Sequence, residues 1–210
     1  MKSTARLPYR RRREGRTDYR LRLLLLKGKK PRLVIRKSAN NLTCQVVAYH
    51  AGGDQILVTA NARHLLGLGW KGGTGSIPAA YLTGLLCGAW ARKQGVTEAV
   101  SDLGLHPSTK WSRLYAALKG ALDAGLKVPH SPEVLPPEDR LLGKHISSWA
   151  AKLKEKDPAR YQAMFSLLLK NNLPPEQLGS HAEEIRKKIQ SPSDAHKATP
   201  MAGKAHGQAP

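Results

Sequence analysis

Hydrophobic and polar positions change their spacing along the chain, and the first third has the composition of short strands. Runs rich in β-branched residues cover 32–37, 42–49 and 55–61. Only the turn sequences 38–41 and 51–54 separate them. Because connections this short join antiparallel neighbours, the pattern predicts a three-stranded antiparallel meander.

The spacing becomes helical over residues 77–94, and Gly95 ends the predicted helix. Ala80, Gly84 and Gly88 recur at every fourth position in it. Residues this small clear one face of the helix, and we expect that face to approach the sheet closely.

A short strand over 98–103 and a helix from Ser108 or Thr109 to about residue 124 follow. A meander strand followed by a helix and another strand implies a right-handed crossover, which sets the fourth strand parallel to a neighbour. The fold class predicted is therefore α/β, with a meander, a parallel crossover strand and packed helices. These elements form a body over residues 30–130.

Both ends of the chain differ from this body. Residues 1–16 have no apolar periodicity and are expected to order only on a partner. With a short helix over 18–26, which Thr17 caps and Gly28 ends, they form a basic N-terminal arm over residues 1–29. Residues 131–190 predict a helical extension, with the following residues on its apolar faces: Leu141, Leu142, Ile146, Trp149, Leu153; Tyr161, Met164, Phe165, Leu168; Leu178, Ala182, Ile185, Ile189. Residues 191–210 are expected to be disordered.

Charge is the most unusual property of the sequence. The chain of 210 residues has 35 Lys and Arg against 15 Asp and Glu, a net charge of +20. Residues 1–37 contain 15 of the basic residues and only Glu14 and Asp18 as acids. A strongly basic arm on a milder body is typical of proteins that bind a phosphate backbone.

The arm favours RNA as that partner. Residues 1–22 contain eight Arg and one Lys, with Tyr9 and Tyr19 among them. Arginine forms bidentate contacts to phosphate and stacks on bases, which suits folded RNA. We expect no membrane segment, and Cys44 and Cys87 are interpreted as buried thiols of a cytoplasmic protein.

Several catalytic and cofactor sites are disfavoured. Residues 67–72 match G-x-G-x-x-G, but they neither follow a strand at once nor open a helix, as a dinucleotide site requires. No spacing suits zinc, and no carboxylate cluster suits a metal-dependent nuclease. Two interpretations stay open for the Gly-rich loop over 67–75. It needs unusual backbone angles, or it approaches nucleic acid closely, with Trp70 as an exposed stacking ring beside Lys71.

Longer motifs then resemble one family. They are 8–20, 30–38, 69–72, 104–107, 118–126 and 128–132, in this order along the chain. Together they resemble the archaeal and eukaryotic form of the large-subunit ribosomal protein that binds 5S rRNA. The resemblance covers about residues 5–170, and the helical extension favours the archaeal form.

This resemblance implies a non-catalytic, ribosome-bound protein without a cofactor. Its partners would be 5S rRNA, 23S rRNA and neighbouring large-subunit ribosomal proteins, in the central protuberance. A free RNA chaperone and an RNA-processing factor with a basic targeting arm remain alternatives. The predicted RNA contacts are Arg6, Tyr9, Arg10, Arg11, Arg12, Arg13, Arg16, Tyr19, Arg20, Arg22, Lys27, Lys29, Lys30, Arg32, Arg36, Lys37, Gly69, Trp70 and Lys71.

Overall fold

A four-stranded sheet forms the centre of the computed structural model, which describes residues 7–191. Its strands are β1 (Arg32–Lys37), β2 (Leu42–Ala48), β3 (Gln55–Asn61) and β4 (Val100–Asp102), in the order β3-β2-β1-β4. β1, β2 and β3 pair antiparallel, and β4 pairs parallel with β1. The predicted meander and its parallel neighbour are confirmed, although β4 is shorter than the run over 98–103.

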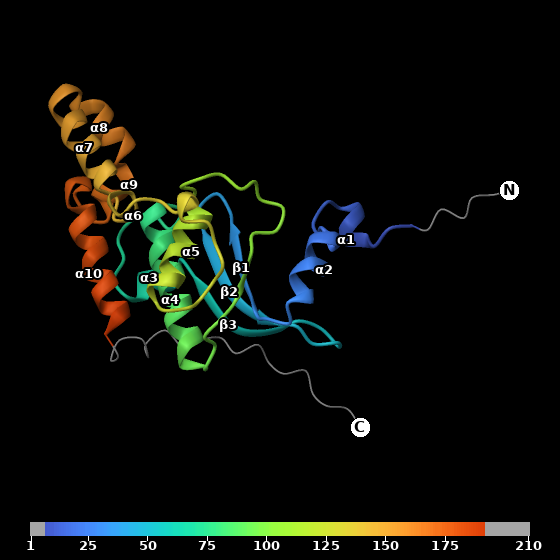
Figure 1. Cartoon of the computed structure of the whole chain (residues 1–210). Coiled ribbons are helices and arrows are strands. Elements are labelled where there is room, and N and C mark those ends of the chain that lie inside the picture. Colours follow the sequence, from blue (N-terminus) through green and yellow to red (C-terminus); the bar gives the residue numbers. More distant parts are fainter. Residues whose placement is uncertain (1–6, 192–210) are drawn as a thin grey trace.

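Two long helices, α4 (Ile77–Lys93) and α5 (Arg113–Asp123), cover one face of this sheet (Figure 1). The stripe of small residues on α4 permits a close approach, but to α5 rather than to the sheet. A Cβ at Gly84 would lie 1.9 Å from the carbonyl oxygen of Ala117. The predicted partner of this stripe was therefore wrong, because helix α5 and not a strand fills the space beside it.

Helix α5 also begins later than predicted. Its N-cap is Ser112, so residues 103–112 form a long loop after β4 in place of the helical start expected at Ser108 or Thr109. The buried residues of α5 include Leu114, Leu118 and Ala121, as its spacing predicts.

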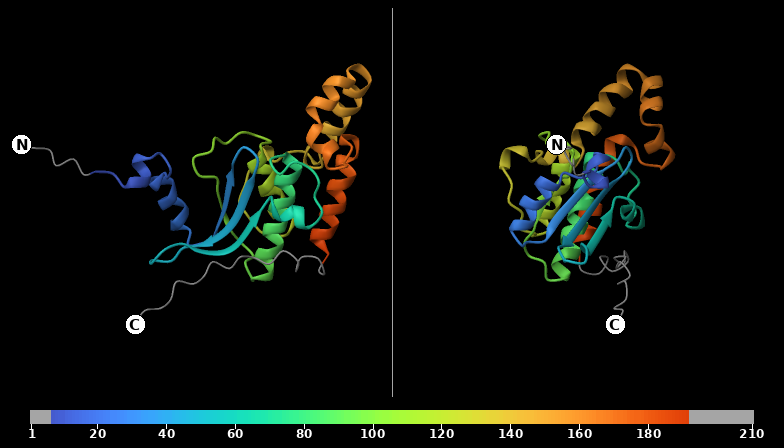
Figure 2. Two further views of the ribbon diagram at one scale, coloured as in Figure 1. Left: turned by 180° about the vertical axis from the view of Figure 1, so that it is seen from behind. Right: turned by 90° about the vertical axis from the view of Figure 1, so that its right-hand side faces the viewer.

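The arm lies on the other side of the sheet from α4 and α5 (Figures 1 and 2). It consists of α1 (Arg10–Arg13) and α2 (Tyr19–Lys27). The prediction that residues 1–16 order only on a partner is wrong for Arg10–Arg13, which form a helical turn. Asp18, not Thr17, caps α2, because its carboxylate accepts the backbone N–H groups of Arg20 and Leu21.

Helices continue to the end of the described chain. Helix α10 (Leu178–Gln190) buries its predicted face, Leu178, Ala182, Ile185 and Ile189, in the same core as the sheet. Residues 150–165 add a small second cluster, from which Trp149 and Met164 are missing. These two side chains are 49% and 54% exposed, so their predicted burial is wrong. The other elements are α3 (His64–Gly67), η1 (Pro132–Val134), α6 (Glu138–Leu141), α7 (Lys144–Lys156), α8 (Pro158–Met164), α9 (Ser166–Lys170) and η2 (Pro175–Gln177).

Two further predictions concern the character of the chain. Cys44 and Cys87 are free, buried thiols, as expected. Among residues 7–191, no helix is long and apolar enough to cross a membrane. The disorder predicted for residues 191–210 concerns a segment that lies, from residue 192 on, outside the described residues.

Candidate nucleic-acid interface

Guanidinium groups gather on the arm, where neither α1 nor α2 has a buried residue. The side chains of Arg10 and Arg16 are 77% and 67% exposed, although both form ion pairs with Glu14. Exposed ion pairs of this kind contribute little to stability. These guanidinium groups therefore stay available to an anionic partner.

Local contacts fix the shape of the arm. The rings of Tyr9 and Tyr19 lie with their centroids 5.1 Å apart, which joins the start of α1 to the start of α2. The Nε of Arg11 donates to the hydroxyl of Thr17 at 2.9 Å. The helical turn that carries the arginines of α1 is thus held in place by residues of the arm itself.

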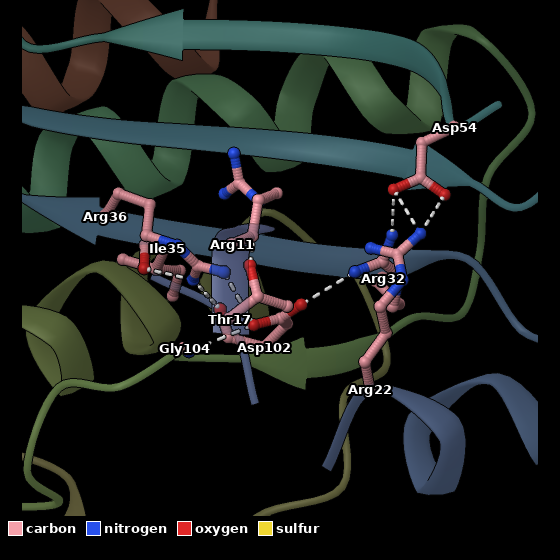
Figure 3. Close-up of polar contacts among 9 residues, drawn as sticks. All are labelled: Arg11, Thr17, Arg22, Arg32, Ile35, Arg36, Asp54, Asp102 and Gly104. Carbon is pink, nitrogen blue, oxygen red and sulfur yellow. Dashed lines mark hydrogen bonds and ion pairs between the residues drawn. The ribbon is translucent and has the colours of Figure 1, made fainter. Parts of the chain in front are cut away.

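A buried arginine connects the arm to the sheet (Figure 3). Arg32 on β1 is 3% exposed, and its two terminal nitrogens donate to Asp102 at 2.7 Å and to Asp54 at 2.6 Å. Asp54 also accepts from Arg22 of α2 at 2.8 Å. Arg32 was predicted as an RNA contact, but its guanidinium group is buried between two carboxylates and holds the arm and the sheet together.

Arg36, four positions along the same strand, uses the same carboxylate differently. It donates to the Asp102 carboxylate at 2.8 Å and to the Asp102 carbonyl at 2.6 Å, yet its side chain is 42% exposed. The backbone N–H of Gly104 completes the set of donors to Asp102 at 3.0 Å. Asp102 thereby orients a guanidinium group that remains accessible from outside.

This arrangement sets the protonation of Asp102. Burial raises its pKa, but the hydrogen bond and charge of Arg36, with the hydrogen bonds from Arg32 and the Gly104 amide, outweigh burial and lower the pKa overall. A carboxyl whose pKa is lower in the folded state stabilises the fold above its unfolded pKa of about 4. That contribution is lost as the pH falls through the folded value.

We therefore expect Asp102→Asn to lower the free energy of unfolding near neutral pH by about 3 kcal/mol, because it leaves a buried arginine short of a charge partner. It should also flatten the loss of stability below about pH 4. Urea unfolding at pH 7 and at pH 3 measures both effects. Glu98→Gln is the control, because the Lys30–Glu98 pair is exposed on both sides. An unchanged unfolding midpoint in Asp102→Asn would contradict the role assigned to this network.

A cavity of about 430 Å³ lies between the arm and the sheet. Five arginines and three aspartates line it, so its walls favour an anion. Leu105 of the loop after β4 also lines it, which brings that loop next to the arm. The charged lining residues are Arg11, Arg16, Arg22, Arg32, Arg36, Asp18, Asp54 and Asp102.

The Gly-rich loop does not join this surface. It lies beside α10, on the side of the molecule away from α1 and α2 (Figure 1). The backbone N–H of Lys71 donates to Nε2 of His181 at 3.2 Å, and its carbonyl accepts from Asn171 at 2.8 Å. The side chain of Lys71 is exposed, but it is separated from the other predicted contacts.

Trp70 is a core residue, and its prediction as an exposed stacking ring is wrong. The ring is 2% exposed and stacks on His181, with centroids 5.2 Å apart and planes 14° apart. A Cβ at Gly72 would lie 2.5 Å from the ring, so the neighbouring glycine makes the room that the indole occupies. Gly69 has a φ of +92°, so the other interpretation, that the Gly-rich loop needs unusual backbone angles, is confirmed.

The remaining predicted contacts lie on the arm or at its junction with the sheet. Among the predicted contacts between residues 7 and 30, all are exposed except Tyr19 and Arg22, which are half-buried, as Lys37 is. Arg6 lies outside the described residues. The exposed or half-buried candidates near the arm are Tyr9, Arg10, Arg11, Arg12, Arg13, Arg16, Tyr19, Arg20, Arg22, Lys27, Lys29, Lys30, Arg36 and Lys37.

Catalytic alternatives find no support in the described part of the chain. Helix α3 follows β3 and includes Gly67, the first glycine of the G-x-G-x-x-G residues, unlike the strand–loop–helix of a dinucleotide site. No group of three or more His, Cys, Asp and Glu side chains between residues 7 and 191 is placed to hold a metal ion. Asp54 and Asp102 lie near each other, but both are bound to arginine.

Sequence reasoning missed Asp54 and Asp102 as the anchors of the interface. One signal was present: residues 38–130 contain only four acids, and these are two of them. An acid in a body with so few acids is a candidate partner for a buried arginine. The sequence does not show which arginine pairs with Asp102, because 70 positions separate Arg32 from Asp102.

Comparisons with known proteins show the family to which the chain belongs. A family model described as "Ribosomal large subunit proteins 60S L5, and 50S L18" matches residues 3–101 and 89–131. A relative from Methanococcus maripaludis, named large ribosomal subunit protein uL18, is 51% identical over 189 residues, which are 90% of this chain and 97% of the relative. Proteins of this kind are structural and not enzymes, so the RNA-processing enzyme is excluded. The chain belongs to the family of ribosomal large-subunit proteins that this model describes.

Proposed function

We propose that the chain binds 5S rRNA and attaches it to 23S rRNA in the central protuberance of the large subunit. The arm, residues 1–29, and the meander side of the body, residues 30–130, hold the 5S rRNA. Other surfaces, including those of the extension over 131–190, contact 23S rRNA and a neighbouring ribosomal protein. Membership of the large-subunit family supports the ribosomal setting of this proposal.

The observation that carries the proposal is the group of exposed arginine side chains on α1 and α2. Arg10 to Arg13 follow one another on a helical turn with no buried residue. A solvent-exposed run of like charges repels itself, and a phosphate backbone neutralises it. Since guanidinium groups bind phosphate in a fixed, bidentate geometry, the run fits RNA with closely spaced phosphates.

The attachment of α2 to the sheet supports the same proposal. Arg22 of the arm forms an ion pair with Asp54, and arginines of the arm and of β1 line one cavity. These contacts hold the arm beside the sheet rather than free in solution. RNA bound to the arm therefore also meets Arg36 at the carboxyl end of β1. Two sets of cations on different elements favour a folded RNA over an extended strand.

Selectivity separates this proposal from a free RNA chaperone. We expect 5S rRNA to bind at least about 10-fold more tightly than a control RNA of the same length and scrambled sequence, at equal salt, because the non-specific phosphate attraction is the same for both. Competition between the two transcripts in a filter-binding assay measures this ratio. Equal affinities would support the chaperone and contradict the proposal.

A further inference from the structure

The loop over 103–112 presents an aromatic ring that the sequence analysis did not select. Trp111, near its end, is 48% exposed. Single exposed apolar side chains are common on proteins, so exposure alone assigns no role. Three further features support a role for this ring: the backbone conformation of Trp111, the contacts that anchor the loop, and the positive charge around it.

The backbone of Trp111 is strained. Its φ is +59°, in the left-handed region that bulky residues rarely adopt. A conformation of this kind persists only where the surrounding structure enforces it, and such positions cluster at binding sites. Here the backbone N–H of Trp111 donates to the carbonyl of Val134 at 3.1 Å.

The loop is also anchored on both sides of the tryptophan. Ser108 and Tyr115 share a hydrogen bond between their hydroxyl groups. Arg113 donates to the carbonyls of Ser38, Ala39 and Gly75 at 2.9 to 3.2 Å. The exposed ring is thus held by a fixed backbone, which lowers the entropy lost when a partner stacks on it.

The charge around the loop is positive. Residues 103–113 contain Lys110 and Arg113 and no acid. The charges of Lys37, Arg36 and Arg113, after burial, lower the pKa of His106, which places that ring among three cations. The nearby acid is Glu133, which is 74% exposed and lies 3.2 Å from Lys110.

The same loop is continuous with the arm. Leu105 shares one hollow with Arg12, Tyr19 and Arg20, and it also lines the cavity that holds Arg11 and Arg36. A partner that lies along the arm therefore reaches this loop without crossing another part of the molecule.

We propose that Trp111 is a stacking platform for an unpaired RNA base, with Lys110 beside it at the adjoining phosphate. An exposed ring next to cations and without free acids fits a base and its phosphates better than the apolar surface of a protein. This inference deepens the proposed function and rests on it, since it names a second contact for the RNA on the arm.

The chain contains a matched control for this proposal. Trp149 on α7 is 49% exposed, in a helical extension on the side of the molecule away from the arm (Figure 1). Trp149→Ala also removes an indole ring, but from a surface to which the proposal assigns no stacked base. Comparing the two tryptophans separates stacking at one site from a general effect of losing an exposed indole.

The test measures binding of a 5S rRNA transcript by Trp111→Ala, Trp111→Phe and Trp149→Ala. Stacking on one base predicts that Trp111→Ala weakens binding by about 5- to 100-fold. Trp111→Phe should lose less, and Trp149→Ala should bind as the unmodified chain does. Because Trp111 is exposed, its variants should unfold at the same urea concentration.

Two results would overturn the proposal and leave the proposed function standing. In the first, Trp111→Ala binds normally while an arm variant loses binding. In the second, Trp111→Ala binds 5S rRNA normally but fails to enter large subunits, which would assign the ring to a protein contact. If the unmodified chain shows no preference for 5S rRNA, the proposed function itself fails.

Discussion

Replacing Arg10, Arg11, Arg12 and Arg13 by Gln is expected to weaken binding of 5S rRNA by about 10³-fold. Each arginine that contacts a phosphate contributes on the order of 1 kcal/mol, and four such losses multiply in the affinity. The fold should be unaffected, because α1 buries none of these side chains. Filter binding measures the affinity, and urea unfolding checks the stability.

The control for this variant removes the same charge elsewhere. The helical extension has four exposed lysines suited to this, Lys152, Lys156, Lys170 and, on α10, Lys187. Their replacement by Gln lowers the net charge equally but leaves the arm intact. A loss of affinity as large as that of the arginine variant would show that total charge, and not the arm, determines binding.

The second large effect concerns stability rather than binding. Trp70→Ala is expected to lower the free energy of unfolding by about 3–5 kcal/mol, because it empties a core site in which the indole stacks on His181. Burial lowers the pKa of His181, which favours the neutral ring whose Nε2 accepts the backbone N–H of Lys71. The folded variant should bind 5S rRNA with unchanged affinity.

Denaturant unfolding and RNA binding of the same Trp70→Ala sample distinguish the two roles. Trp149→Ala serves as the control for stability, because its ring is half exposed and its removal should change the unfolding free energy by less than about 0.5 kcal/mol. A variant of Trp70 that keeps its stability and loses RNA affinity would restore the stacking role predicted from the sequence.

Strands and long helices were predictable because local patterns determine them. The bounds of β1 and β3 match the predicted runs, and α10 buries the face that its spacing indicates. Turn residues fix the antiparallel register between neighbours, so the meander needed no information from distant parts of the chain.

Single positions were not predictable where a distant element decides their environment. Trp70 was interpreted as exposed because glycines surround it, yet Gly72 makes room for its ring and His181, 111 positions later, covers it. Arg32 was interpreted as an RNA contact, but Asp54 from the turn before β3 and Asp102 at the end of β4 enclose it. The arm has no such covering element, which is why its exposure followed from composition alone.

Mapping the contact sites directly tests the central claim most closely. Ultraviolet crosslinking of the full chain to 5S rRNA, followed by peptide identification, reports which residues touch the RNA. We predict crosslinks within residues 7–37, with Tyr9 and Tyr19 among them, and at the loop over 103–112. Crosslinks confined to α7, α8 and α10, with none in the arm, would contradict the account.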